Sequence, residues 1–216
     1  MYSQPHSICL LSEALVIHKS PAVSTYFYKE HRHPALAQTI IDHNRSTSDI
    51  TQMAQRQIAV IGSLNVDFIT RTSRVPNGGE TLTANSFDTG NGGKGANQAV
   101  ACARLADKHV KVAMVGNVGD DTFGSDYFQA LQAEGIDTSK IRKLTGQKTG
   151  IANIIVEDST GENRILLAPN ANHAFSAEPS AEWDMVPEEA DMVIFQLEIP
   201  LPVVSTSLRR TDIILC

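Results

Sequence analysis

Three short apolar runs constrain the fold of this chain more than any other feature. They cover residues 58–62, 110–115 and 191–198, and each consists mainly of apolar residues such as Val, Ile, Ala or Met. Runs of this length without strict alternation are typical of strands that a parallel sheet buries on both faces. Residues 96–105 and 123–134, which lie between them, have the composition and spacing of helices. Strands that alternate with helices predict an α/β fold.

A smaller β unit is predicted by two segments that are more polar. Residues 80–89 alternate weakly between apolar and polar positions, as an exposed strand does. Residues 150–156 and 164–167 flank an Asp-Ser-Thr-Gly sequence at 158–161, which favours a hairpin. We therefore expect a main sheet with a small β appendage.

The first 52 residues differ from the rest of the chain. They hold four basic and four acidic residues and five of the seven histidines, without a sustained helical or strand period. We expect residues 1–52 to be a disordered or spurious extension, with Met53 as the natural start. His31 and His33 have no cysteine or carboxylate partner at ligand spacing, so a solvated tail is favoured over a metal site. Residues 53–208 then form the domain, and residues 209–216 a divergent tail.

Composition excludes several classes of protein. The 18 basic and 24 acidic residues give a net charge of −6, which offers no general attraction for nucleic acid or anionic lipid. No run approaches the ~18 apolar residues that a membrane helix needs. Cys9, Cys102 and Cys216 form neither a disulfide framework nor a zinc motif, which indicates a reducing compartment, and we expect the cytoplasm. Glu13 and Glu30 disfavour a mitochondrial leader.

The densest glycine cluster, residues 90–95, leads directly into the helix expected at 96–105. A phosphate-binding P-loop requires Ser or Thr after its lysine, but Gly95 follows Lys94. The spacing of the glycines does match the dinucleotide fingerprint GxGxxG. However, polar residues 86–89 precede it where a buried strand is required, and no acidic residue follows at the right distance. A dinucleotide site is therefore disfavoured.

Polar side chains follow two of the predicted strands and begin one helix. Asn65 and Asp67 lie just past the first strand on one face, Lys94 and Asn97 lie at the helix start, and Glu198 ends a later strand. In open α/β sheets, ligands bind at the carboxyl ends of the strands. Carboxylates, amides and a lysine that meet there could bind several hydroxyl groups at once, which suits a polyol.

Each of these residues also has a structural explanation when it is taken alone. Asp67 could cap a turn, Asn97 could occupy a helical first turn, Lys94 could be solvated and Glu198 could end a surface strand. None of these explanations accounts for the glycine cluster, and we therefore favour the polyol site.

The same residues carry a resemblance to a known family. Gly-Ser-Leu-Asn-Val-Asp at 62–67, Gly-Gly-Lys-Gly-Ala-Asn-Gln-Ala at 92–99 and Gln-Leu-Glu at 196–198 resemble, in order, the motifs of the ribokinase/PfkB carbohydrate kinases. Residues 118–124 and the Ala-Asn pair at 171–172 are similar to further signatures of that family. The resemblance spans roughly residues 57–200.

The resemblance implies a three-layer α/β/α domain with a small β lid near residues 80–89 and 150–168, which in this family also pairs two subunits into a homodimer. It implies ATP-dependent phosphorylation of the 5-hydroxyl of D-ribose, with Mg²⁺ and a monovalent cation such as K⁺. The residues it implies for ribose binding are Asn65, Val66, Asp67, Gly93, Lys94, Gly95, Ala96, Asn97 and Glu198.

The family's catalytic base is the Asp of a Gly-Ala-Gly-Asp motif, and this sequence does not contain that motif. We therefore expect no catalytic base in this chain, and a family domain truncated after the strand that ends at Glu198. Two functions remain open: a sugar kinase whose catalysis belongs to the full-length product, and a non-catalytic sugar-binding or lid-pairing fragment. A sheet without its later strands would expose an edge, so we also expect poor solubility.

Overall fold

The computed structural model describes residues 7–11, 14–18 and 55–209. Its main sheet has six strands in the order β1-β2-β10-β3-β6-β7. The three predicted apolar runs form its centre as β10 (Met192–Gln196), β3 (Arg56–Ile61) and β6 (Val110–Gly119), which are parallel. The short β7 (Ile141–Leu144) extends the parallel order beside the end of β6. The predicted α/β class is confirmed.

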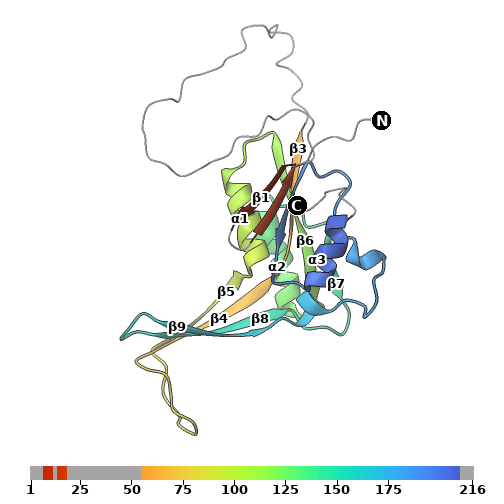
Figure 1. Cartoon of the computed structure of the whole chain (residues 1–216). Helices are drawn as coiled ribbons and strands as arrows, with labels where there is room; N and C mark the ends of the chain where they lie inside the picture. Colours follow the sequence, from red (N-terminus) through yellow and green to blue (C-terminus); the bar gives the residue numbers. More distant parts are fainter. Residues whose placement is uncertain (1–6, 12–13, 19–54, 210–216) are drawn as a thin grey trace, which may run out of the picture.

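Helices cover both faces of this sheet (Figure 1). α1 (Lys94–Leu105) and α2 (Thr122–Ala133) lie on one face, and α3 (Leu201–Arg209) lies on the other. β3 feeds both layers, because Val60 packs with the α1 and α2 side chains while Ala59 and Ile61 pack with those of α3. This is the expected three-layer arrangement. No helix within the described residues is both long enough and apolar enough to cross a membrane.

The start and the end of α2 follow from its sequence. Asp121 is the N-cap, and its carboxylate accepts a hydrogen bond from the Gly124 N–H at 2.9 Å. Gly135 follows the helix at φ +75°, a conformation that glycine adopts readily. Tyr127 and Leu131 are buried on the face turned toward the sheet, as their spacing predicts.

A second, small sheet projects from this body (Figure 1). Its strand order is β5-β4-β8-β9, and only the β4–β8 pair is parallel. The strands are β4 (Asn65–Thr72), β5 (Ser86–Gly92), β8 (Gly150–Glu157) and β9 (Asn163–Ala168). The hairpin predicted around residues 158–161 is therefore present as β8 and β9. β4 starts four residues after β3 ends, so one short connection joins the two sheets.

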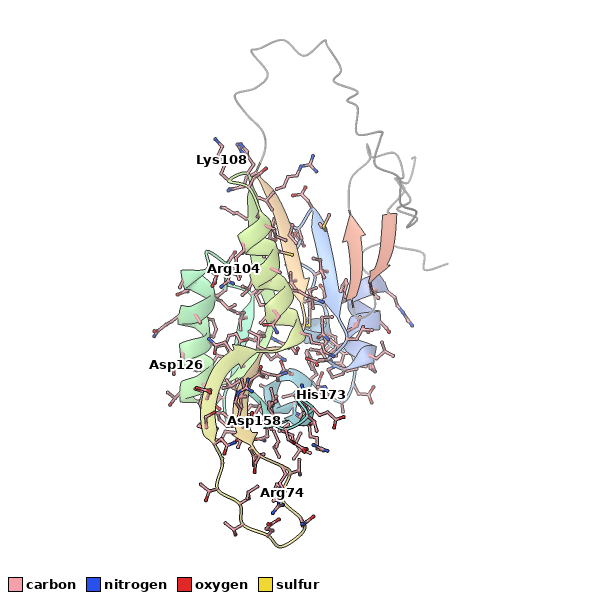
Figure 2. The ribbon with its side chains drawn as sticks, turned by 90° about the vertical axis from the view of Figure 1, so that its left-hand side faces the viewer. Arg74, Arg104, Lys108, Asp126, Asp158 and His173 are labelled. Carbon is pink, nitrogen blue, oxygen red and sulfur yellow. The ribbon has the colours of Figure 1, made fainter. Side chains whose placement is uncertain are left out.

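The strand expected at 80–89 is displaced along the chain. Residues 80–85 form no strand, because Glu80 closes a turn by accepting from the Arg74 guanidinium at 2.8 Å and from the Asn77 N–H at 2.9 Å. Figure 2 places Arg74 on this loop, at the far end of the molecule from Lys108. β5 instead runs through Gly90–Gly92 of the glycine cluster, because these residues pair with β4.

The N-terminal extension contains two strands that we did not expect. β1 (Ser7–Leu11) and β2 (Ala14–His18) form a hairpin, and β2 pairs antiparallel with β10, from Ala14 opposite Gln196 to His18 opposite Met192. Residues 7–11 and 14–18 are therefore strands and the outer edge of β10 is paired rather than open, whereas the disordered or spurious extension expected over residues 1–52 stays a prediction. His31, His33 and residues 210–216 lie outside the described residues.

Candidate functional site

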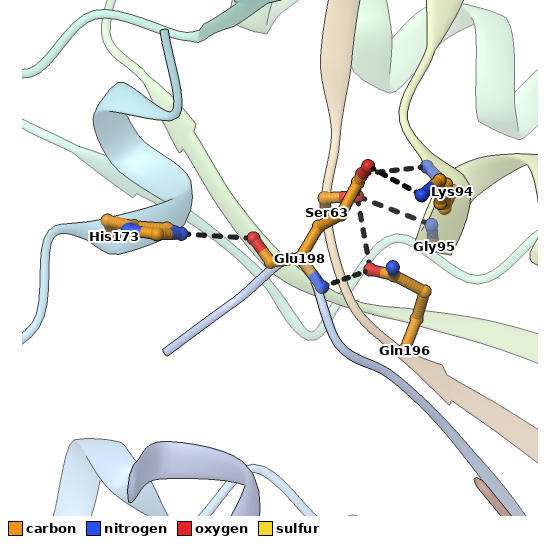
Figure 3. Close-up of polar contacts among 6 residues, drawn as sticks. All are labelled: Ser63, Lys94, Gly95, His173, Gln196 and Glu198. Carbon is orange, nitrogen blue, oxygen red and sulfur yellow. Dashed lines mark hydrogen bonds and ion pairs between the residues drawn. The ribbon is translucent and has the colours of Figure 1, made fainter. Parts of the chain in front are cut away.

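Ser63 lies where the carboxyl ends of β3 and β10 meet the start of α1. Its hydroxyl donates to the Glu198 carboxylate, with Oγ 2.7 Å from Oε2, and it lies 3.3 Å from Oε1 of Gln196 (Figure 3). The Gly95 N–H in turn donates to Ser63 Oγ at 3.4 Å. One small hydroxyl therefore links a helix start to the residues that follow a strand.

Glu198 is held from several directions. The Lys94 N–H donates to its Oε2 at 3.3 Å, and the Lys94 ammonium lies 3.4 Å from Oε1. Its own N–H donates to Gln196 Oε1 at 2.9 Å, and Nε2 of His173 lies 3.1 Å from its carbonyl oxygen (Figure 3). The carboxylate is consequently fixed in direction before any ligand arrives.

The first N–H groups of α1 already have protein acceptors. Lys94 N donates to Glu198, Gly95 N to the Ser63 hydroxyl and Ala96 N to the Ser63 carbonyl at 3.0 Å. A helix start binds phosphate through N–H groups that are still available. This arrangement argues against a phosphate cradle at α1, in line with the sequence.

Gly93 brings α1 against the start of β4. Its φ of +88° lies in the region that favours glycine, and a Cβ on it would lie 2.7 Å from Asn65 N and 2.8 Å from Ser63 O. A side chain at this position would push the helix start away from Asn65. The glycine cluster thus allows a close approach of two backbones.

Asn65 and Asp67 lie on one face of the small sheet, as predicted. They are paired with Gly92 and Gly90 of β5, whereas Val66 and Phe68 turn to the other face and pack with the core on the α1 and α2 side. The Asp67 carboxylate lies directly over Gly92, where any Cβ would overlap it. Asp67 is therefore next to Gly93 and the α1 start.

The surroundings of Asp67 favour ligands that donate hydrogen bonds. Burial, and then the negative charge of Glu198, raise the pKa of its carboxyl group. Within the described residues no side chain hydrogen-bonds this carboxylate. Tyr127 donates its hydroxyl to the Gly92 carbonyl, and burial followed by the charge of Asp67 raises the pKa of that phenol. Hydroxyl groups of a ligand would supply the donors that Asp67 lacks.

The structure brings most of the predicted site residues together. Asn65, Asp67, Gly93, Lys94, Gly95 and Glu198 surround one region at the junction of the two sheets. The side chains of Val66 and Ala96 are buried in the core, so only their backbones could face a ligand. Asn97 is exposed on α1 and forms no side-chain hydrogen bond with another described residue.

Sequence reasoning assigned no role to several residues that build this site, namely Ser63, Tyr127, Asn172, His173 and Gln196. Ser63, Gln196 and Asn172 lie inside the motifs quoted above, so the sequence motifs could have indicated that they belong to the site. No sequence motif could have indicated Tyr127 and His173, because they contact backbone carbonyl groups of distant residues.

The described residues include no group of three or more His, Cys, Asp or Glu side chains that could hold a metal ion. The described site consists of hydrogen-bonding side chains on glycine-rich backbone, and these groups could donate to and accept from hydroxyl groups.

The family model for pfkB family carbohydrate kinases matches residues 55–210, which include the small sheet, the parallel strands of the main sheet and every site residue. This chain belongs to the pfkB family of carbohydrate kinases. It is 44% identical over 155 residues to a ribokinase of Schizosaccharomyces pombe, covering 70% of this chain and 48% of that protein. It is 41% identical over 147 residues to a deoxyribokinase of Salmonella typhi, covering 68% and 47%.

A solved structure of Arabidopsis thaliana ribokinase complexed with ribose and ATP is also similar. Its TM-score is 0.61 at 30% identity, and the match covers 73% of this chain and 50% of that one. The pfkB family fold is thus shown by sequence and by structure. The chain spans about half the length of the curated relatives it matches.

Proposed function

We propose that this chain provides the sugar-binding side of a ribokinase-type reaction, the ATP-dependent phosphorylation of D-ribose to ribose 5-phosphate. The observation that carries the proposal is the meeting of Asp67 and Glu198, one on the small sheet and one after β10, at the start of α1. The similarity to a ribokinase whose structure holds ribose and ATP supports the choice of sugar.

In this proposal the sugar hydroxyls bind between two acceptors and two donors. Asp67 and Glu198 accept from hydroxyl groups, while the Asn65 amide and the Lys94 ammonium donate to hydroxyl oxygens. Glu198 needs little reorganisation, because Ser63 and the Lys94 N–H already orient it. The small sheet acts as a lid, and its closure keeps out water that would compete as phosphoryl acceptor.

The phosphoryl donor in this proposal is ATP, with Mg²⁺ and a monovalent cation such as K⁺. The described residues offer little for a nucleotide, since the first N–H groups of α1 are already bonded within the protein. We therefore assign the nucleotide site and the catalytic base to the Gly-Ala-Gly-Asp region of the full-length enzyme, which this sequence does not contain. We expect no turnover by this chain alone, and we expect the reaction to occur in the cytoplasm.

Calorimetric titration with D-ribose tests the binding half of the proposal. We expect saturable binding to the chain, and about tenfold weaker binding to Asp67→Asn, because a hydrogen bond to a charged acceptor is worth roughly 1.5–3 kcal/mol. Asp126→Asn is the matched control, since it removes the same charge from an exposed position on α2 (Figure 2). Equal ribose affinity of Asp67→Asn and the unaltered chain would contradict the role of Asp67.

A second candidate is a non-catalytic module that binds sugar or pairs with another copy through its lid. The exposed apolar residues of the small sheet favour it, since 55% of Ile165 and 46% of Leu167 are accessible. Both lie on the face that carries Asp67. Two measurements separate the candidates. Ribose-dependent ATP turnover by the full-length protein supports the kinase, and pairing of this chain through its small sheet supports the non-catalytic module.

A further inference from the structure

A buried asparagine outside the predicted site, Asn172, forms a hydrogen bond to the site residue Asn65. Asn172 follows β9 in the short 3₁₀ helix η2 (Asn170–His173) and is 1% exposed. Its Oδ1 accepts from the Leu64 N–H at 2.9 Å, and its Nδ2 donates to the Leu64 carbonyl at 2.9 Å. The same Nδ2 donates to Asn65 Oδ1 at 2.8 Å. Both the oxygen and the NH₂ group of the Asn172 carboxamide therefore have hydrogen-bond partners.

These contacts leave only one orientation for the Asn172 amide. A carboxamide has one acceptor end and one donor end, and the backbone of Leu64 presents a donor and an acceptor in the matching order. Turning the amide over would place its N–H groups against the Leu64 N–H and its oxygen against the Leu64 carbonyl, so that neither contact could be a hydrogen bond. The end that faces Asn65 is therefore the donor.

The orientation of Asn65 follows from that of Asn172. Because Oδ1 of Asn65 accepts from Asn172, its Nδ2 is the end left for a ligand. Within residues 55–209 this Nδ2 forms no hydrogen bond to a protein acceptor. Asn65 thus offers a donor on the same face of β4 on which Asp67 offers an acceptor. Neighbouring hydroxyl groups can satisfy both, because each hydroxyl both donates and accepts.

Gly150 makes this contact possible. It pairs with Asn65 across β4 and β8, and a Cβ on it would overlap both Asn172 Nδ2 and Asn65 Oδ1. The preceding Thr149 is fixed as well, since its N–H donates to Asp121 Oδ2 at 2.9 Å. The start of the lid strand β8 is therefore built around the two asparagines.

We propose that Asn172 is a positioning residue that holds the Asn65 amide with its N–H groups toward the sugar, and so selects for a ligand hydroxyl at that place. The proposal rests on the sugar-binding function proposed above. A sugar that lacks this hydroxyl would bury the Asn65 N–H groups without an acceptor, which disfavours its binding.

Two substitutions of Asn172 distinguish this role from a merely structural one. In Asn172→Asp, measured at pH 8, an oxygen replaces Nδ2, so Asn65 turns over to donate to it and presents Oδ1 to the sugar. We expect ribose affinity to fall about tenfold or more in this variant, because the amide then offers the wrong group. In Asn172→Ala the Asn65 amide is unconstrained and can still turn its donor to the sugar, so we expect a smaller loss of affinity.

A purely structural role predicts that the loss of ribose affinity follows the loss of thermal stability in both variants, because alanine removes all three hydrogen bonds and aspartate sets an oxygen against the Leu64 carbonyl. Asn117→Asp is the matched control: Asn117 is also 1% exposed and its Nδ2 donates to a carbonyl, that of Ala171, yet its hydrogen bonds within the described residues do not include Asn65. Its ribose affinity should stay within about twofold of the unaltered chain, while thermal unfolding reports any general loss of stability in all three variants. Weaker binding by Asn172→Ala than by Asn172→Asp would overturn the proposal.

A measurement on the unaltered chain keeps the test independent of variant folding. In ¹⁵N spectra of side-chain amides, the Asn172 signals should be protected from water exchange and unmoved by ribose, whereas the Asn65 signals should exchange and shift. The reverse pattern would overturn the proposal. If calorimetry shows no ribose binding, the sugar-binding function fails, and exchange in the free protein still decides the orientation: equally fast exchange of both amides refutes it.

Discussion

At the scale of single residues, the site depends on two carboxylates held close to one another. Glu198 is stabilised by Ser63, by the Lys94 N–H and by the Lys94 ammonium, so its charge is well compensated. Asp67 has no comparable donor among the described residues, and burial and Glu198 both raise its pKa. Asp67 is therefore the acceptor that gains most from a ligand hydroxyl.

This asymmetry predicts that ribose affinity depends on pH through Asp67. A raised pKa means that the free protein holds the Asp67 proton more strongly than an ordinary aspartate does, so acidification does not unfold the chain through this group. Ribose hydroxyls bind the ionised form. Affinity should therefore fall as pH drops from neutral toward the raised pKa, starting above the range of an ordinary aspartate.

Calorimetry at a series of pH values, in buffers of different ionisation enthalpy, measures this effect as proton release on binding. Asp67→Asn should lose most of the pH dependence that the unaltered chain shows. If the variant and the unaltered chain respond to pH alike, another group is responsible.

At the scale of elements, the small sheet is anchored at its base and apolar toward its end. Asp121 caps α2 and also accepts from the N–H and hydroxyl of Thr149, at 2.9 and 2.6 Å, immediately before β8 begins. Burial opposes ionisation of Asp121, but the bonds from Thr149 and Gly124 outweigh it and lower its pKa. Farther along, Ile165 pairs with Ile154 and Ile154 with Ile69, which forms an apolar row on the Asp67 face.

The apolar row predicts that two copies of the chain pair through their small sheets. Ile165→Lys should shift the chain toward monomer, because a charge would be buried in the contact. Leu105→Lys is the control, since Leu105 is 87% exposed but lies at the end of α1. Sedimentation equilibrium measures the change, and a chain that is monomeric at all concentrations before substitution would refute the pairing.

The sequence predicted those elements whose signals are local. The apolar runs at β3, β6 and β10 were recognisable because burial on both faces leaves few polar positions, and Asp121 was recognisable as a helix cap. The path of β5 through Gly90–Gly92 was not, because glycine disfavours strands and is tolerated there only through pairing with β4. The Asn172–Asn65 contact was also unpredictable, since 107 residues separate its partners.

At the scale of the whole molecule, the N-terminal hairpin replaces the open edge that we expected. β2 covers the outer side of β10 with an antiparallel register of five residue pairs. An unpaired edge strand is a template for association with other chains. We therefore expect the solubility of this chain to depend on the ten residues of β1 and β2, which no local pattern revealed.

Removal of residues 1–18 should make the chain aggregate, because β10 would lose its antiparallel neighbour. A chain that begins at Ser7 keeps both strands and is the control. Val16→Pro offers a point variant, since proline removes a backbone N–H opposite Ile194. Light scattering over a concentration series should rise for the deletion and for Val16→Pro only; unchanged scattering for both would show that this edge needs no cover.

The pairing of β2 with β10 also bears on synthesis. His18 pairs with Met192, 174 residues later in the chain, so β2 leaves the ribosome before its partner strand β10 has been made. At usual rates of translation that delay is roughly ten to thirty seconds. During this interval a nascent chain carries an undocked hairpin, and a chaperone that binds extended segments would find a ready target in β1 and β2.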